Sequence, residues 1–167
     1  MKNVVIVGAS RTPMGGFHGE LSQASATDLG GSAIKGAMDD AKVNLNDVNE
    51  VIMGNVLSAG LGQAPARQAS FKAGLSEDVP AVTLNKMCGS GLKSVIYAHD
   101  QVKAGTSDLV AAGGMESMTN APYLAPKMRS GAKVGHQQMY DHMFLDGLED
   151  VYGPGRLVGT FAEDTAE

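Results

Sequence analysis

The order of strand-like and helical segments is the feature that most restricts how this 167-residue chain can fold. Short apolar runs rich in β-branched residues alternate with longer stretches of helical periodicity, and glycines separate them. This alternation predicts an open α/β sheet with helices on its faces. The predicted strands are Lys2–Ala9, Glu50–Leu57, Ala81–Asn85 and Asp108–Ala112, and the predicted helices are Thr27–Ala41, Pro65–Ala73 and Gly89–Ala104.

Two of the predicted helices carry further local signals. Thr27 is a plausible N-cap for the first helix, with Asp28 favourably placed near the positive end of the helix dipole. The third helix has the pattern of an amphipathic helix. Its apolar residues and one histidine share a face: Leu92, Val95, Ile96, His99 and Val102.

Composition excludes several classes of protein. The net charge is -5 without a basic run, so we expect no nucleic-acid partner. The longest apolar runs are strand-sized, so no membrane span or signal peptide is predicted, and a cytoplasmic location (or an organelle matrix) is expected. A single cysteine forms no internal disulfide and no cysteine-rich zinc site.

The composition changes after about residue 115. The stretch MESMTNAPYLAPKMRSGAKVG has two prolines and no steady period, which predicts a long extended excursion. A helix is predicted from about 137 to 148, and a further helix start in GTFAEDTAE at 159–167. We therefore divide the chain into residues 1–118 and 119–167.

The only cysteine, Cys88, lies in NKMCGSGL, where a predicted strand becomes a predicted helix. The carboxyl ends of strands are where open α/β sheets place functional sites, and a helix N-terminus favours the reactive thiolate. Gly89 and Gly91 leave room for a substrate carbonyl to approach the sulfur and the Cys88 N–H, which would form one arm of an oxyanion hole. The position resembles a nucleophile elbow. Spacing alone also allows a small buried cysteine. A phosphate-binding loop does not fit, because Leu92 stands where that motif needs glycine.

No partner base for Cys88 is evident. His99 would lie about 15 Å away along the helix, and His136 and His142 are poorly spaced for metal ligands on one helix face. His18 reads as a surface histidine. Glu116, just past a strand end, is the best local carboxylate, and we expect it to anchor a loop. No metal site is predicted.

Five irregular segments resemble the thiolases, the acyl-CoA C-acyltransferases, and most closely their acetyl-CoA acetyltransferase branch. They span essentially the whole chain: ASRTPMGGFHGEL (9–21), GNVLSAGLGQAPARQASFKAGL (54–75), NKMCGSGLKSV (85–95), AAGGMESMTNAPYL (111–124) and GTFAEDTAE (159–167). The resemblance implies an α/β thiolase-like fold: residues 1–118 would be the N-terminal half, a mixed sheet covered by helices. Residues 119–167 would begin the inserted loop domain that covers substrate and mediates tetramer contacts.

The resemblance also implies site residues. Cys88 would accept the acyl group as a thioester, with its backbone N–H in the oxyanion hole. Leu148 resembles a position lining the pantetheine tunnel, and Leu157 and Val158 stand where the family often has histidine and methionine beside the acyl group. That departure leaves a strict preference for acetyl chains in doubt. No cofactor is expected, because the coenzyme A thioester (acetyl-CoA or a 3-ketoacyl-CoA) is the substrate, and a homo-oligomer is expected.

The family's second half supplies an activating histidine and a second cysteine, in motifs that this sequence does not contain. We therefore expect the 167-residue chain alone to be inactive. A related condensing enzyme of the ketoacyl-synthase type is one alternative, but the long matches at 54–75 and 111–124 argue against it. A second alternative stays open: a truncated, non-catalytic thiolase-like module with an oligomerisation or coenzyme-A-binding role.

Overall fold

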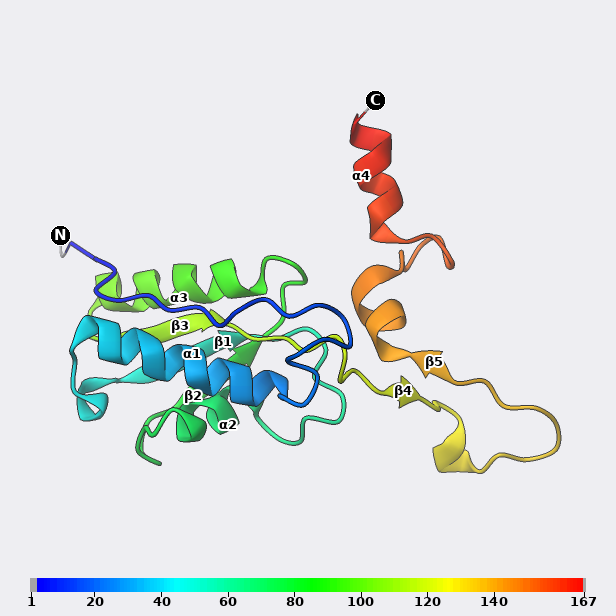
Figure 1. Cartoon of the computed structure of the whole chain (residues 1–167), viewed down its shortest axis with the longest axis horizontal. Helices are drawn as coiled ribbons and strands as arrows, with labels where there is room; N and C mark the ends of the chain where they lie inside the picture. Colours follow the sequence, from blue (N-terminus) through cyan, green and yellow to red (C-terminus); the bar gives the residue numbers. More distant parts are fainter. Residues whose placement is uncertain (1–2, 167) are drawn as a thin grey trace.

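The computed structural model describes residues 3–166 and has the predicted α/β architecture (Figure 1). Three parallel strands form a sheet in the order β2-β1-β3, and each pair of successive strands is joined by a helix. The elements are α1 (Ala26–Ala41), β1 (Glu50–Gly54), α2 (Pro65–Lys72), β2 (Ala81–Leu84), α3 (Ser90–Ala104) and β3 (Val110–Gly114), with a short 3₁₀ turn at Leu45–Asp47. Each lies within a few residues of its predicted range.

The sheet is covered on both faces, with α1 and α2 packed together on one side and α3 on the other (Figure 1). Because β1 is the central strand, its residues Val51, Ile52 and Met53 are almost fully buried. The close approach of α1 to α2 depends on two glycines of α1. A Cβ on Gly30 or Gly31 would lie 3.2 Å from the Ala69 side chain or 2.6 Å from that of Lys72. The absence of side chains at these two positions therefore allows α1 and α2 to pack closely.

The N-cap of α1 differs from the prediction. Ser25, not Thr27, caps the helix: its hydroxyl accepts the Asp28 N–H, and the Asp28 carboxylate accepts the Ser25 N–H. This reciprocal capping box satisfies two amide groups at once, which Thr27 at the cap would not do. Thr27 is instead buried, where its hydroxyl accepts a hydrogen bond from Lys72.

The first predicted strand, Lys2–Ala9, is wrong for the residues described; Lys2 itself lies outside them. Residues 3–9 are extended but form no strand, and Val5 and Ile6 are 71% and 80% exposed. A strand needs a hydrogen-bonded neighbour. This segment runs between α1 and α3 (Figure 1), and a cavity of about 620 Å³ lies between it and β3. Its apolar sequence is therefore strand-like without strand pairing.

The apolar face predicted for α3 is not buried against the sheet: three of its residues, Val95, His99 and Val102, line the cavity beside β3. Leu92 is 69% exposed, and Val95 and Ile96 are also exposed. The buried residues of α3 are small: Ser90, Ser94 and Ala98. Small side chains are required there because the start of α3 packs directly on the backbone of β1 and β3 at Gly54 and Gly114.

Beyond β3 the chain leaves the α/β layers and forms only short elements (Figure 1). Strands β4 (Tyr123–Leu124) and β5 (Tyr140–Asp141) pair antiparallel, with a 3₁₀ turn at Met128–Ser130 between them. The helix predicted at 137–148 is confined to a π-helical turn at Phe144–Leu148, because β5 occupies 140–141; the final predicted helix is confirmed as α4 (Val158–Ala166). Within residues 3–166, no helix combines the length and apolar character needed to cross a membrane. The division at 118/119 into two domains stays a prediction.

Candidate active site

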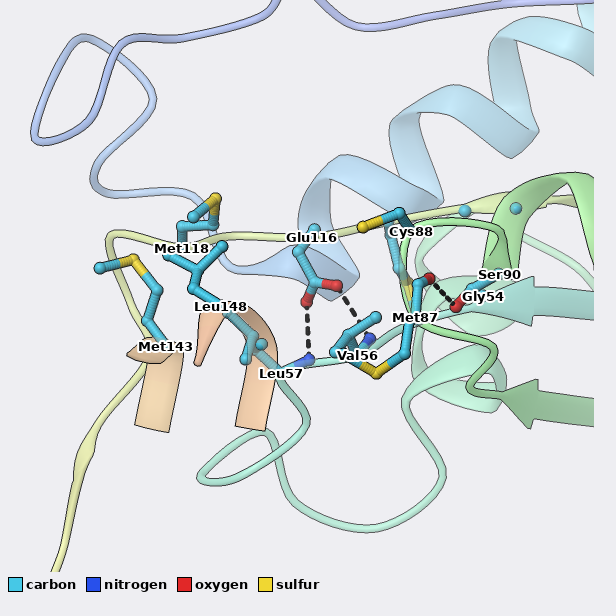
Figure 2. A pocket seen from close by; sticks show the side chains of 14 residues that line it. Gly54, Val56, Leu57, Met87, Cys88, Ser90, Glu116, Met118, Met143 and Leu148 are labelled. Atoms are coloured by element: carbon cyan, nitrogen blue, oxygen red, sulfur yellow. Dashed lines mark hydrogen bonds between the residues drawn. The ribbon is translucent and has the colours of Figure 1, made fainter. Parts of the chain in front are cut away.

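A pocket of about 430 Å³ opens at the carboxyl end of the sheet (Figure 2). Four segments distant in the sequence converge on it: the loop after β1, the turn before α3, the chain after β3, and the π-helical turn. Its lining is mostly apolar and rich in methionine, and it includes Val56, Leu57, Met87, Cys88, Met115, Glu116, Met118, Met143 and Leu148. The structure therefore has a pocket at the edge where the sequence predicts a functional site, and the function of that pocket stays a prediction.

Cys88 lies in the turn between β2 and α3, two residues before the first residue of the helix. Its side chain is exposed and lines the pocket, which excludes the alternative of a small buried cysteine. The preceding residue, Met87, has a φ of 48°, a left-handed conformation uncommon for a residue with a side chain. Such conformations persist where the surrounding structure holds them, and they concentrate at functional sites.

Glycines at two strand ends bring the start of α3 against the sheet. A Cβ on Gly54 would lie 2.6 Å from the Ser90 Cβ, and one on Gly114 would lie 3.2 Å from the Gly91 Cα. Neither position tolerates a side chain without movement of the helix. The N-terminus of α3, and with it Cys88, is thereby held at the mouth of the pocket.

Glu116 anchors a loop, as predicted. Its carboxylate accepts hydrogen bonds from the backbone N–H groups of Val56 (2.8 Å) and Leu57 (3.0 Å) (Figure 2). It also accepts one from the Asn55 side chain (2.7 Å). Burial raises the pKa of Glu116, while the two backbone hydrogen bonds act in the opposite direction. These bonds fix the wall of the pocket formed by residues 56–57. Because they occupy both carboxylate oxygens, Glu116 is arranged as an anchor rather than as a free base.

His142 joins the later part of the chain to the same loop, a role that sequence reasoning missed. The side chain is only 5% exposed. Its Nε2 accepts the Ala59 N–H at 3.3 Å, and its Nδ1 lies 2.6 Å from an Asp146 carboxylate oxygen. These contacts hold the segment that carries Leu148 over the pocket. The four-residue spacing of His142 and Asp146 is a sequence signal for their pairing, but nothing local indicates the contact with Ala59.

The structure brings together some of the predicted site residues and not others. Cys88 and Leu148 line the same pocket. Leu157 bridges to Glu149 and lines a separate depression, and Val158 begins α4, half-exposed; neither lines the Cys88 pocket. Their proposed contact with substrate stays a prediction.

The remaining histidines do not supply a base. The His99 ring pairs with its neighbour Asp100, and among the residues lining the pocket only Cys88 and Glu116 are titratable. In the part of the chain that the structure describes, no three His, Cys, Asp or Glu side chains gather in a way that could hold a metal ion.

Comparison with known proteins agrees with this site. Residues 4–167 match the family described as "Thiolase, N-terminal domain". The chain is 55% identical to acetyl-CoA acetyltransferase of Escherichia coli (strain K12) over 149 aligned residues. The aligned region covers 89% of this chain and 38% of the relative. It is 49% identical over 164 residues to acetyl-CoA acetyltransferase of Schizosaccharomyces pombe, and the aligned region covers 98% of this chain and 41% of the relative. It is 48% identical over 167 residues to the acetyl-CoA acetyltransferase of Cupriavidus necator, with 100% of this chain and 42% of the relative covered.

The chain thus spans about two fifths of the length of these relatives. The family match covers nearly every residue, including the Cys88 turn and the later segment that closes the pocket. The chain belongs to the thiolase family and corresponds to its N-terminal domain.

Proposed function

We propose that the protein containing this chain is an acyl-CoA C-acetyltransferase that uses Cys88 as its acyl-accepting nucleophile. The observation that carries the proposal is an exposed, solitary cysteine at a helix N-terminus, in an apolar pocket. Relatives about half identical to the chain bear the name acetyl-CoA acetyltransferase, which supports an acetyl-CoA substrate.

In the proposed first step, the Cys88 thiolate attacks the thioester carbonyl of acetyl-CoA. A new C–S bond forms to Cys88, the C–S bond to coenzyme A breaks, and the coenzyme A thiolate leaves with the electron pair and takes up a proton. In the second step, a base from the part of the protein outside this chain removes a methyl proton from another acetyl-CoA. The resulting carbanion attacks the acetyl-cysteine, a C–C bond forms as the C–S bond to Cys88 breaks, and the products are acetoacetyl-CoA and the restored Cys88 thiolate. The reverse direction is thiolysis of a 3-ketoacyl-CoA.

The pocket has features suited to the first step. The turn's backbone hydrogen bonds use the amides of Gly89 and Ser90 but not that of Cys88. The Cys88 N–H is therefore available as one donor of an oxyanion hole. Methionine and leucine side chains on the opposite wall suit an acyl chain and the apolar part of a pantetheine arm. We assign Leu148 to that wall, and Leu157 and Val158 to the acyl contact in the complete protein, which we expect to be a homo-oligomer without a separate cofactor.

The isolated 167-residue chain should not turn over, because the described pocket lining contains no histidine to activate the thiol. Thiolysis of acetoacetyl-CoA should be measured for the isolated chain and for the complete protein. We expect turnover only by the complete protein, lost on Cys88→Ala, and an acetyl thioester on Cys88 detectable by mass spectrometry after incubation with acetyl-CoA. Turnover that persists in Cys88→Ala would refute the assignment.

The absence of a base in the described pocket lining also favours one alternative, a non-catalytic thiolase-like module with an oligomerisation or coenzyme-A-binding role. The same experiment separates the two. Binding of coenzyme A by the complete protein, with no acetyl-cysteine and no turnover, would favour the alternative.

A further inference from the structure

The turn that carries Cys88 is closed by the hydroxyl group of Ser90. This hydroxyl accepts the Lys86 N–H at 2.9 Å and donates to the Met87 carbonyl at 2.6 Å. The Met87 carbonyl also accepts the Ser90 N–H at 3.0 Å, and the Lys86 carbonyl accepts the Gly89 N–H at 3.1 Å. One side chain therefore joins both ends of the turn, and Cys88 lies between the residues that it connects. Figure 2 shows the bond from Ser90 to Met87.

Ser90 has little freedom to do anything else. It is buried against Gly54, and both hydrogen-bonding directions of its hydroxyl are used inside the turn. A second, weaker support comes from Asn85, whose exposed side-chain oxygen accepts the Met87 N–H at 2.9 Å. These contacts hold Met87 in its left-handed conformation, which a residue with a side chain adopts only at a cost in energy.

We propose that Ser90 is a positioning residue that aligns the Cys88 sulfur and the Cys88 N–H toward the same acyl carbonyl. Acyl transfer needs both groups at once: the sulfur forms the new bond while the N–H stabilises the oxygen's developing negative charge. The purpose of this alignment rests on the proposed function. The alignment itself can be tested without coenzyme A.

Ser94 provides a matched control on the same helix. It is also buried, and its hydroxyl donates to the carbonyls of Gly91 (2.6 Å) and Gly113 (2.7 Å). It does not line the Cys88 pocket and makes no hydrogen bond within the turn. Ser94→Ala and Ser90→Ala each remove one buried hydroxyl with two hydrogen bonds, so a loss of general stability affects both.

Because Cys88 is the only cysteine, its chemistry can be followed without interference from another thiol. Two reagents separate alignment from access, both applied to the 167-residue chain at one pH. p-Nitrophenyl acetate acylates the thiolate through a tetrahedral oxyanion and releases p-nitrophenolate. Iodoacetamide alkylates it by displacement of iodide, with no oxyanion. Mass spectrometry of the peptide containing Cys88 gives both rate constants, and amide hydrogen exchange reports whether the turn is closed.

We expect Ser90→Ala to lower the ratio of acylation to alkylation rate constants by about tenfold, part of the loss seen when an oxyanion donor is removed outright. Exchange at Lys86, Gly89 and Ser90 should accelerate. Ser94→Ala should change neither. Asn85→Ala, at an exposed position, should lower the ratio of rate constants and accelerate amide exchange as Ser90→Ala does, but by a smaller factor. This variant serves as the test if Ser90→Ala does not fold.

An unchanged rate ratio in the folded Ser90→Ala chain, or equal changes in Ser90→Ala and Ser94→Ala, would overturn the positioning role. If Ser90→Ala does not fold, an unchanged ratio in Asn85→Ala would do the same. Neither reagent contains coenzyme A, so these results do not depend on whether acetyl-CoA is the substrate. Absence of acetyl-CoA turnover in the complete protein would count against the proposed function alone.

Discussion

The α/β layers and the segment after β3 are held by different kinds of interaction. In the α/β layers, residues from α1, α2, β1 and β3 share one apolar core, and the central strand is buried on both faces. Apart from Met115, which directly follows β3 and packs into that core, the later segment contributes only Met143 and His142 as buried residues among those described, and α4 has none. Hydrophobic burial thus stabilises the first region, whereas a few specific contacts attach the second.

The pocket lies where these two regions meet, which explains its mixed construction. Cys88 belongs to the well-packed layers, and the opposite wall at Met143 and Leu148 belongs to the weakly packed segment. A Cβ on Gly147 would lie 3.2 Å from a Leu57 methyl group, so the two regions also approach closely beside the pocket. We infer that the nucleophile is held rigidly and that the opposite wall is the part able to adapt to substrate.

The largest effect should come from truncating a methionine in the core. Met53→Ala removes a side chain that is 2% exposed and should lower the free energy of unfolding by about 2–5 kcal/mol. Met139→Ala removes the same atoms from a side chain of the later segment that is 66% exposed. This variant should change the free energy of unfolding by less than about 0.5 kcal/mol. Urea denaturation followed by circular dichroism measures both. Similar losses would contradict the contrast between the regions.

An intermediate and local effect is expected from His142→Ala. The change removes the acceptor of the Ala59 N–H and the partner of Asp146, contacts that together contribute about 1–3 kcal/mol. Limited proteolysis within residues 143–157 should become faster, while exchange of the β1 amides stays slow. His136→Ala, at an exposed position, is the control. Accelerated exchange in β1 would show that the two regions unfold together.

Local patterns predicted most elements of the α/β layers because each depends on nearby residues. The helix and strand ranges, and the position of Cys88 at a strand-to-helix turn, follow from periodicity and glycine placement, whereas the exposure of Cys88 does not. The strand prediction for residues 3–9 was wrong because a strand also needs a hydrogen-bonded partner at the right distance. A local sequence pattern carries no information about such a partner. The same holds for the apolar face of α3, whose orientation is set by close contact with Gly54 and Gly114.

The site could be predicted only in part, for a related reason. Cys88 and Glu116 could be found because strand ends mark the functional edge of an α/β sheet. His142 lies 83 residues from Ala59, and Met118 and Met143 join the pocket through an irregular chain path. Sequence periodicity carries no signal for such contacts. The family resemblance implied Leu148, Leu157 and Val158 as site residues, and in the structure Leu148 lines the Cys88 pocket whereas Leu157 and Val158 do not.

The smallest expected effect concerns the surface contact that joins α1 to α2. Hydrogen bonds from Lys72 and Ser25 lower the pKa of Asp28 from 3.8 to about 2. Because the folded-state pKa is the lower one, the stabilisation is present above pH 3.8 and is lost as the pH falls through about 2. The Asp28 and Lys72 side chains are partly exposed, so the contribution should not exceed about 1 kcal/mol.

Asp28→Asn should therefore lower the thermal unfolding temperature slightly at pH 6, and the difference from the wild type should shrink as the pH approaches 2. Lys72→Met removes the partner and should reproduce the loss over the same pH range. Because this contact lies within the α/β layers, neither variant should change proteolysis within 143–157. A difference from the wild type that stays constant down to pH 2 would mean that the capping box with Ser25, rather than the charge of Asp28, supplies the stabilisation.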